Sequence, residues 1–154
     1  MNNQLIPLDY ANNLIFEIQK AFWDERGKGA RFRLTTIGRD FYIEKVQSRI
    51  KSNSIEGIVN EVTVVLQEEG ILGNGSIEVE DQLIRIKMNS CLHRPIEDKL
   101  ASLNIEPCSC LPANICALAI TDQLKLPVEL AELKLENGYC QALLIVFENN
   151  RSSD

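Results

Sequence analysis

Residues 128–147 read VELAELKLENGYCQALLIVF and decide the fold of the C-terminal half. Two stretches rich in aliphatic residues, 128–135 and 139–147, flank the pair Asn137 and Gly138. Asn-Gly favours a two-residue type I′ hairpin turn, because both central positions of that turn need a positive φ. Residues 143–147 carry no polar side chain, which is typical of a central strand covered on both faces. The stretch therefore predicts an antiparallel hairpin whose second strand lies inside a sheet.

A second hairpin is expected upstream, where residues 76–79 and 83–88 alternate between apolar and polar side chains. Alternation with a period of two is typical of a strand with one covered and one solvated face. Residues 80–82 would close this hairpin. The sequence Gly-Asn-Gly at 73–75 lacks the third glycine of a dinucleotide loop, so we expect a turn there.

Helical periodicity accounts for most of the remaining chain. The expected helices cover residues 9–26, 38–51, 54–70, 95–103 and 112–124. Ser54 is suited to an N-cap and Gly70 to a C-terminal stop. Because residues 112–124 are apolar nearly all round, that helix should be buried.

The element order predicts an α+β fold: three N-terminal helices, then hairpin, two helices and hairpin. The two hairpins would form a four-stranded, mostly antiparallel sheet packed against helices. A chain of 154 residues that is 45% hydrophobic can build one core of this kind. We expect residues 1–148 to form a single ligand-binding or sensor domain and residues 149–154 to form a solvated tail.

The net charge and the lengths of the apolar segments argue against two kinds of partner, nucleic acid and the membrane interior. A formal charge of −6 opposes the phosphate backbone, and the loose basic cluster is too small to reverse it, so no nucleic-acid partner is expected. That cluster consists of Lys28, Arg31, Arg33 and Arg39. No segment has the apolar length of a membrane span, and the first residues do not read as a secretory signal. A soluble, cytoplasmic protein is the expectation.

Candidate chemistry gathers around the cysteines and the single histidine. Three thiols, Cys91, Cys108 and Cys110, precede expected helix N-termini, where unpaired amides and the helix dipole lower a thiol's pKa. Together with His93 they form the expected ligand-binding set. Cys116 lies within the apolar helix and is expected in the core.

Metal binding is an alternative use of the same side chains. Cys91, Cys108, Cys110 and Cys140 would supply enough soft ligands for zinc or an iron–sulfur cluster, with His93 in reserve. The C-x-C spacing of Cys108 and Cys110 is not the usual C-x-x-C chelate. Buried free cysteines also serve as small hydrophobic residues, and a lone histidine is often inert, so a purely structural interpretation stays open.

The motifs NSCLHRP, EPCSCLPANIC and LENGYCQALLIVF resemble those of the 4-vinyl reductase, or hydrocarbon-binding, domain family. They more loosely resemble the sensory half of iron–sulfur cluster assembly repressors. The resemblance covers residues 55–148 and matches Cys91, Cys108 and Cys140 to the family cysteines. It implies ligand sensing in a pocket between helices and sheet, with Glu132 as an acidic partner of a zinc site. Leu135 stands where the family has a further cysteine, which weakens the implied metal site.

Three functions follow as hypotheses. The first is a stand-alone module that binds a hydrophobic or tetrapyrrole-like small molecule. The second is a redox or metal sensor holding zinc or an iron–sulfur cluster. The third is a structural or assembly partner in which the helix at residues 9–26 packs across a homodimer. An enzyme with a cysteine nucleophile and His93 as its base is a further, less favoured hypothesis, and a vinyl or ring reductase would need a reductant site that the sequence does not show.

Overall fold

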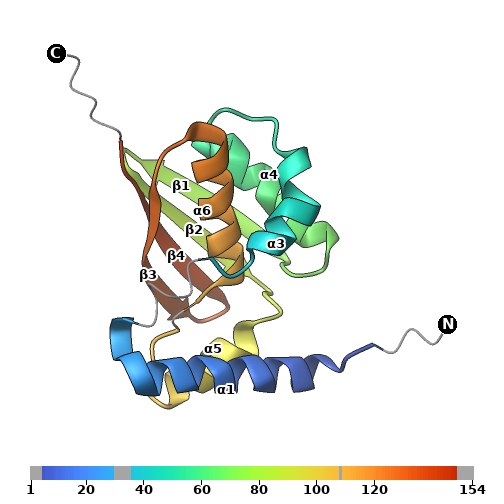
Figure 1. Cartoon of the computed structure of the whole chain (residues 1–154), viewed down its shortest axis with the longest axis vertical. Coiled ribbons are helices and arrows are strands. Elements are labelled where there is room, and N and C mark those ends of the chain that lie inside the picture. The colour runs from blue at the N-terminus through green and yellow to red at the C-terminus, as the bar shows by residue number, and fades with distance from the viewer. Residues whose placement is uncertain (1–4, 30–35, 108, 149–154) are drawn as a thin grey trace.

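The computed structural model describes residues 5–29, 36–107 and 109–148 (Figure 1). Its helices are α1 (Leu8–Arg26), η1 (Gly27–Gly29), α3 (Arg39–Phe41), η2 (Tyr42–Val46), η3 (Gln47–Arg49), α4 (Ile55–Glu68), α5 (Arg94–Ser102) and α6 (Leu111–Leu124). Its strands are β1 (Asn74–Glu80), β2 (Leu83–Asn89), β3 (Val128–Glu136) and β4 (Tyr139–Val146). The predicted order of elements, and with it the α+β class, is confirmed. Cys108, residues 31–35 with Arg31 and Arg33, and the expected tail lie outside the described residues.

The strands form one antiparallel sheet in the order β1-β2-β4-β3. Strand β4 is therefore central, as its apolar sequence predicts. The expected two-residue hairpin turn joins Glu136 to Tyr139, but its predicted type I′ is wrong, because Gly138 has a φ of 85° while Asn137 does not have a positive φ. The turn expected at residues 73–75 is wrong in part, because Asn74 and Gly75 already belong to β1 and pair with Asn89 and Met88. Pairing with the end of β2 extends the first strand beyond its apolar residues.

Helices α4 and α6 pack together on one face of the sheet (Figure 1). The buried residues of β2 and β4 alternate with half-buried ones, and the buried set joins the main hydrophobic cluster under these two helices. On the opposite face Leu143 and Ile145 are only half-buried. The expectation that β4 is covered on both faces is thus wrong for the described residues, because both helices lie on the same side.

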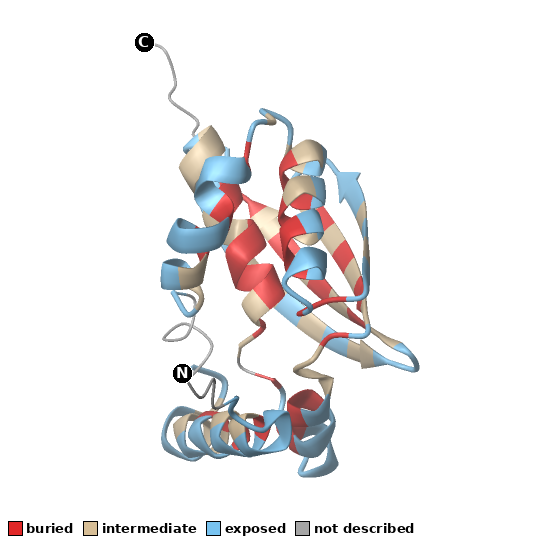
Figure 2. Cartoon of the chain, turned by 90° about the vertical axis from the view of Figure 1, so that its right-hand side faces the viewer, coloured by how far each residue is buried: buried red, intermediate tan, exposed pale blue. Residues whose placement is uncertain are grey.

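Helices α1 and α5 form a separate layer beyond one end of the sheet (Figure 2). They share a second, smaller cluster in which Phe16 of α1 packs with Ile96 and Leu100 of α5. The side chain of Asn12 on α1 donates a hydrogen bond to the Leu92 carbonyl at 3.1 Å. The molecule therefore has two hydrophobic clusters, and the space between them is where a pocket can form.

Local signals explain where the helices begin. The Ser54 hydroxyl accepts a hydrogen bond from the Gly57 amide at 3.1 Å, which confirms the predicted N-cap of α4. The helix expected at residues 38–51 is a succession of three short turns, α3, η2 and η3. Helix α6 is largely buried, as its uniform apolar surface predicts.

None of the helices in the described part of the chain has both the length and the hydropathy of a membrane span.

Candidate functional site

A pocket of about 240 Å³ lies between the two hydrophobic clusters. Its lining includes Ile15 and Ile18 of α1, Ile96 and Glu97 of α5, and Leu111 and Pro112 of α6. The lining is mostly apolar. A site of this type binds a ligand by removing apolar surface from water, and a few polar groups fix the ligand's orientation.

The pocket opens to solvent where α1 faces the segment before α3. Ile18 and Ile37 line it, yet their side chains are 50% and 45% exposed. The segment is held by Asn114, a buried residue of α6 whose amide donates to the Ile37 carbonyl at 3.1 Å. A small molecule can thus reach the pocket without disturbing the main cluster.

Polar side chains also line this apolar space, and two of them, Glu97 and His93, have an unpaired buried atom. Glu97 is only 4% exposed, and its Oε2 atom has no hydrogen-bond partner among the described residues. His93 precedes α5 by one residue, and its buried Nδ1 atom likewise lacks a partner within the described ranges. Buried polar atoms are nearly always hydrogen-bonded, so two unpaired ones lining a single pocket indicate a place for a ligand's polar group.

The surroundings of these two side chains shift their protonation. Burial raises the pKa of Glu97 to about 7, although the neighbouring Arg94 charge opposes the shift. Burial also lowers the pKa of His93, so its imidazole is neutral near pH 7. His93 is half-buried, because the start of α5 carries this residue into the wall of the pocket.

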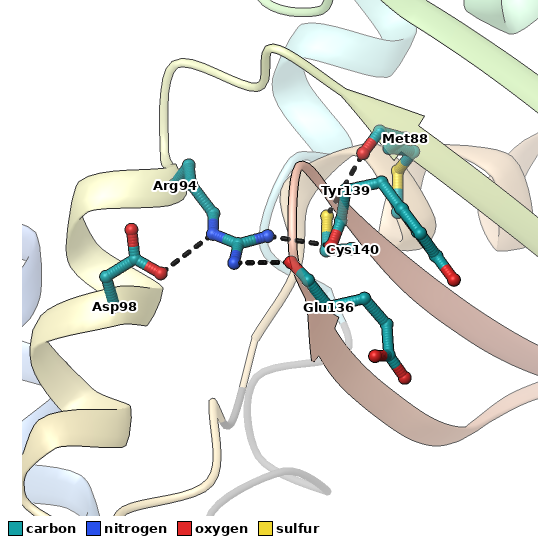
Figure 3. A network of polar contacts seen from close by, with 6 residues as sticks. All are labelled: Met88, Arg94, Asp98, Glu136, Tyr139 and Cys140. Carbon is teal, nitrogen blue, oxygen red and sulfur yellow. Dashed lines mark hydrogen bonds and ion pairs between the residues drawn. The ribbon is translucent and has the colours of Figure 1, made fainter.

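Arg94, the cation beside Glu97, is committed to other partners (Figure 3). Its Nε donates to Asp98 at 2.8 Å, while Nη1 and Nη2 donate to the carbonyls of Tyr139 and Glu136, both at 2.8 Å. These bonds tie the start of α5 to the β3–β4 hairpin. Because Arg94 also forms an ion pair with Asp98 at 2.8 Å, its charge does not act on Glu97 alone.

The predicted ligand-binding residues line two neighbouring cavities, and the thiols Cys91, Cys110 and Cys140 lie close enough to influence one another's pKa. His93 and Cys110 line the pocket between the clusters. Cys91 lines a different cavity of about 360 Å³, together with Cys140 and Arg94. Cys108, the fourth predicted residue, lies outside the described part of the chain.

The thiols are less reactive than their positions before helices suggest. Burial raises the pKa of Cys91 and raises that of Cys110 well above its usual value. The pKa of Cys140 rises to about 12 for the same reason, with the Glu97 and Cys91 charges adding to the effect. The expectation that a helix N-terminus lowers these values is wrong for Cys91 and Cys110, because desolvation outweighs the helix dipole. Cys116 is 3% exposed within the main cluster, which confirms its place in the core.

The described residues contain no group of three or more His, Cys, Asp or Glu side chains placed to hold a metal ion. Glu132 is exposed and pairs with Lys134 at 3.6 Å, on the opposite side of the sheet from the buried Cys140. The set Cys91, Cys108, Cys110 and Cys140 includes one residue outside the described ranges, so it stays a prediction.

Glu97 is the functional candidate that the sequence interpretation missed. It lies on the same helical face as His93 four residues earlier and Leu100 three residues later. A carboxylate on the apolar stripe of an amphipathic helix is the signal that could have identified it. That signal was obscured because Asp98, the next residue, is an ordinary exposed acid.

Neither the protein-family models nor the curated proteins contain a match to this chain. Among solved structures, the chain is similar to the phenol-responsive sensory domain of the transcription activator PoxR, in its crystal structure with phenol. The TM-score is 0.60 at 10% sequence identity, and the similarity covers 88% of this chain and 74% of that chain. At this identity the similarity is one of fold. The chain thus has the fold of a known small-molecule sensory domain.

Proposed function

We propose that this protein is a small-molecule-binding sensor module whose ligand occupies the pocket between α1, α5 and the start of α6. The observation that carries the proposal is the apolar pocket with two unpaired buried polar atoms in its wall. The similarity of fold to a phenol-responsive sensory domain supports the same conclusion. The finer assignment to the 4-vinyl reductase family rests on the sequence motifs and stays a hypothesis.

The size of the pocket favours a compact ligand. An engineered cavity of about 150 Å³ takes up benzene, so 240 Å³ suffices for one substituted ring or an aliphatic chain of similar bulk. A tetrapyrrole contains four such rings joined in one plane and exceeds this volume. We therefore propose a single-ring or equally compact hydrophobic molecule in place of the larger ligand.

A pocket-filling variant tests this function. Propylbenzene at about a hundred times its Kd should stabilise the native protein by about 2.7 kcal/mol and raise its Tm by several degrees. Ile15→Trp places an indole in the pocket and should abolish the shift. Leu14→Trp is the matched control, because Leu14 neighbours Ile15 on α1 but is 48% exposed and outside the pocket lining.

Two results would contradict the proposal. One is the absence of any Tm shift with propylbenzene and with a panel of other single-ring compounds. The other is an equal shift in wild type and Ile15→Trp, which would place the binding elsewhere. Native mass spectrometry of freshly purified protein adds an independent reading, because a co-purifying ligand in this mass range would identify the natural class directly.

The cysteines have a secondary place in this proposal. Cys110 contributes to the pocket wall, whereas Cys91 and Cys140 line the neighbouring cavity. Zinc or an iron–sulfur cluster remains the alternative use of these thiols with Cys108. Elemental analysis and an anaerobic absorption spectrum test it, and metal-free protein whose stability does not change in chelator would remove it.

Assembly into a homodimer is a second candidate function, favoured by the outer face of α1. Tyr10, Leu14 and Ile18 follow one another at four-residue steps on this helix and are about half exposed or more. A second copy of α1 is an occupant of matching apolar character. Analytical ultracentrifugation should show a dimer that Leu14→Glu dissociates, and a wild-type monomer at high concentration would contradict it.

A further inference from the structure

The Glu97 carboxyl is a buried acid without a cation of its own. Arg94 lies close enough to affect it, but its three donor nitrogens are bonded to Asp98 and to two hairpin carbonyls (Figure 3). The Cys140 thiol forms a hydrogen bond with the Glu97 carboxyl, so the unpaired oxygen is Oε2 alone. The other titratable groups near Glu97 are Asp98 and the thiols Cys91 and Cys110. None of these groups carries a positive charge. Buried carboxylates are normally paired with a cation or kept neutral. The ionised carboxylate of Glu97 therefore lacks a positively charged partner of its own.

We propose that the ligand of this pocket is a compact hydrophobic amine, whose protonated amino group binds Glu97 and His93 while its apolar body fills the space between the clusters. This inference rests on the proposed function and adds the chemical class of the ligand. It is carried by the two unpaired buried atoms, Glu97 Oε2 and His93 Nδ1, which belong to two residues that line one pocket.

An amino group satisfies the site more completely than a hydroxyl group does. An ammonium has three donors and no acceptor, so it can bond the carboxylate and the neutral imidazole nitrogen together. A hydroxyl donates only once, and it would have to rely on a protonated Glu97 to make a second bond. The ammonium also supplies the missing positive charge, and a protein with a net charge of −6 attracts cations over long range.

Matched single-ring probes test the proposal on the full chain. We would measure the Kd values of 2-phenylethylamine, 2-phenylethanol and propylbenzene at pH 8 by isothermal titration calorimetry, because the three differ only in their terminal group. A charge-assisted hydrogen bond in a buried site is worth on the order of a tenfold to hundredfold change in affinity. The amine should therefore bind at least about tenfold more tightly than either neutral probe.

Glu97→Gln keeps the shape of the side chain and removes its charge. It should bring the Kd of the amine to within about twofold of the Kd of propylbenzene measured on the same variant. Glu129→Gln is the matched control, because it removes the same charge from an exposed position on β3 and should leave all three affinities as in wild type.

The outcomes separate this inference from the proposed function. If the neutral probes bind but the amine has no advantage, the amine proposal is wrong and the apolar pocket stands. If none of the three binds, both proposals fail. The comparison within wild type needs no variant, so the absence of an amine advantage overturns the amine proposal even if Glu97→Gln does not fold.

Discussion

At the scale of single residues, burial decides the behaviour of this site more than sequence position does. Glu97, His93 and Cys110 line the same pocket. Desolvation shifts the pKa of each group in the direction that favours its uncharged form. A mostly apolar wall favours uncharged groups in this way, unless a ligand brings a compensating charge. The empty pocket therefore favours the uncharged forms of these side chains, and a charged ligand would change their protonation.

Glu97 should make the protein less stable as the pH rises. Its pKa in the native state is about 7 against 4.5 for the ordinary group, so the native state holds the proton more tightly than the unfolded state. The free energy of unfolding should fall between about pH 4.5 and pH 7, by up to about 3 kcal/mol. Urea denaturation at pH 5 and pH 8 measures this change. In Glu97→Gln the difference in the free energy of unfolding between the two pH values should be smaller by the contribution of Glu97. An equal pH dependence in wild type and variant would contradict the prediction.

The described thiols should react slowly in the native protein. Burial raises the pKa of Cys91, Cys110 and Cys140, so little thiolate is present at neutral pH. In a Cys108→Ser background, alkylation by iodoacetamide at pH 7.5 should be at least about a hundredfold slower than in urea. Peptide mass spectrometry assigns each rate. A thiol that reacts as fast in the native as in the unfolded chain would restore the interpretation as a cysteine enzyme.

At the scale of elements, Arg94 joins helix α5 to the β3–β4 hairpin. The guanidinium bonds the carbonyls of Tyr139 and Glu136 while its Nε holds Asp98 (Figure 3). A lysine carries the same charge but cannot reproduce this fork of donors. The geometry of the pocket wall thus depends on one side chain at the start of α5.

Arg94→Lys should lower the free energy of unfolding by about 1–3 kcal/mol, because it leaves hairpin carbonyls without their donors. Arg85→Lys is the matched control. Arg85 forms one ion pair with the exposed Glu80 at 3.3 Å, and this substitution should lower the free energy of unfolding by less than about 0.5 kcal/mol. Urea denaturation compares the two variants. Equal effects would mean that Arg94 does not anchor α5.

At the scale of the whole molecule, the pocket lies where two hydrophobic clusters meet. The main cluster holds the sheet with α4 and α6, and the smaller one holds α1 with α5 (Figure 2). A ligand in the pocket contacts both sets of helices and adds apolar contacts between them. Binding would therefore strengthen the attachment of the α1–α5 layer, which is a physical basis for a sensor's response.

Hydrogen exchange can detect this coupling. Saturating propylbenzene should slow amide exchange in Leu8–Arg26 and Arg94–Ser102 several-fold, while the strands β2 and β4 change little, because local opening of the outer layer becomes more costly. Ile15→Trp should show the slower exchange without ligand. Protection confined to the sheet would place the ligand away from the boundary between the clusters.

Local signals in the sequence account for most of the elements and for the two antiparallel hairpins, but not for the order of all four strands. The Asn137–Gly138 turn, the alternating residues of β2 and the capping by Ser54 are local signals, and each acts within a few residues of the chain. For the same reason the burial of Cys116 followed from the composition of its own helix. Local propensity and periodicity suffice for such features because neighbours along the chain create them.

The site, in contrast, depends on contacts between residues far apart in the sequence. Which cysteine lines which cavity, the pairing of Arg94 with the distant hairpin, and the burial of Glu97 depend on how α5 meets α1 and the sheet. The rise in the thiol pKa values also follows from desolvation by residues far away in sequence, which outweighs the local helix dipole. Periodicity indicates which face of a helix is apolar, but it does not say what that face packs against or where a gap is left.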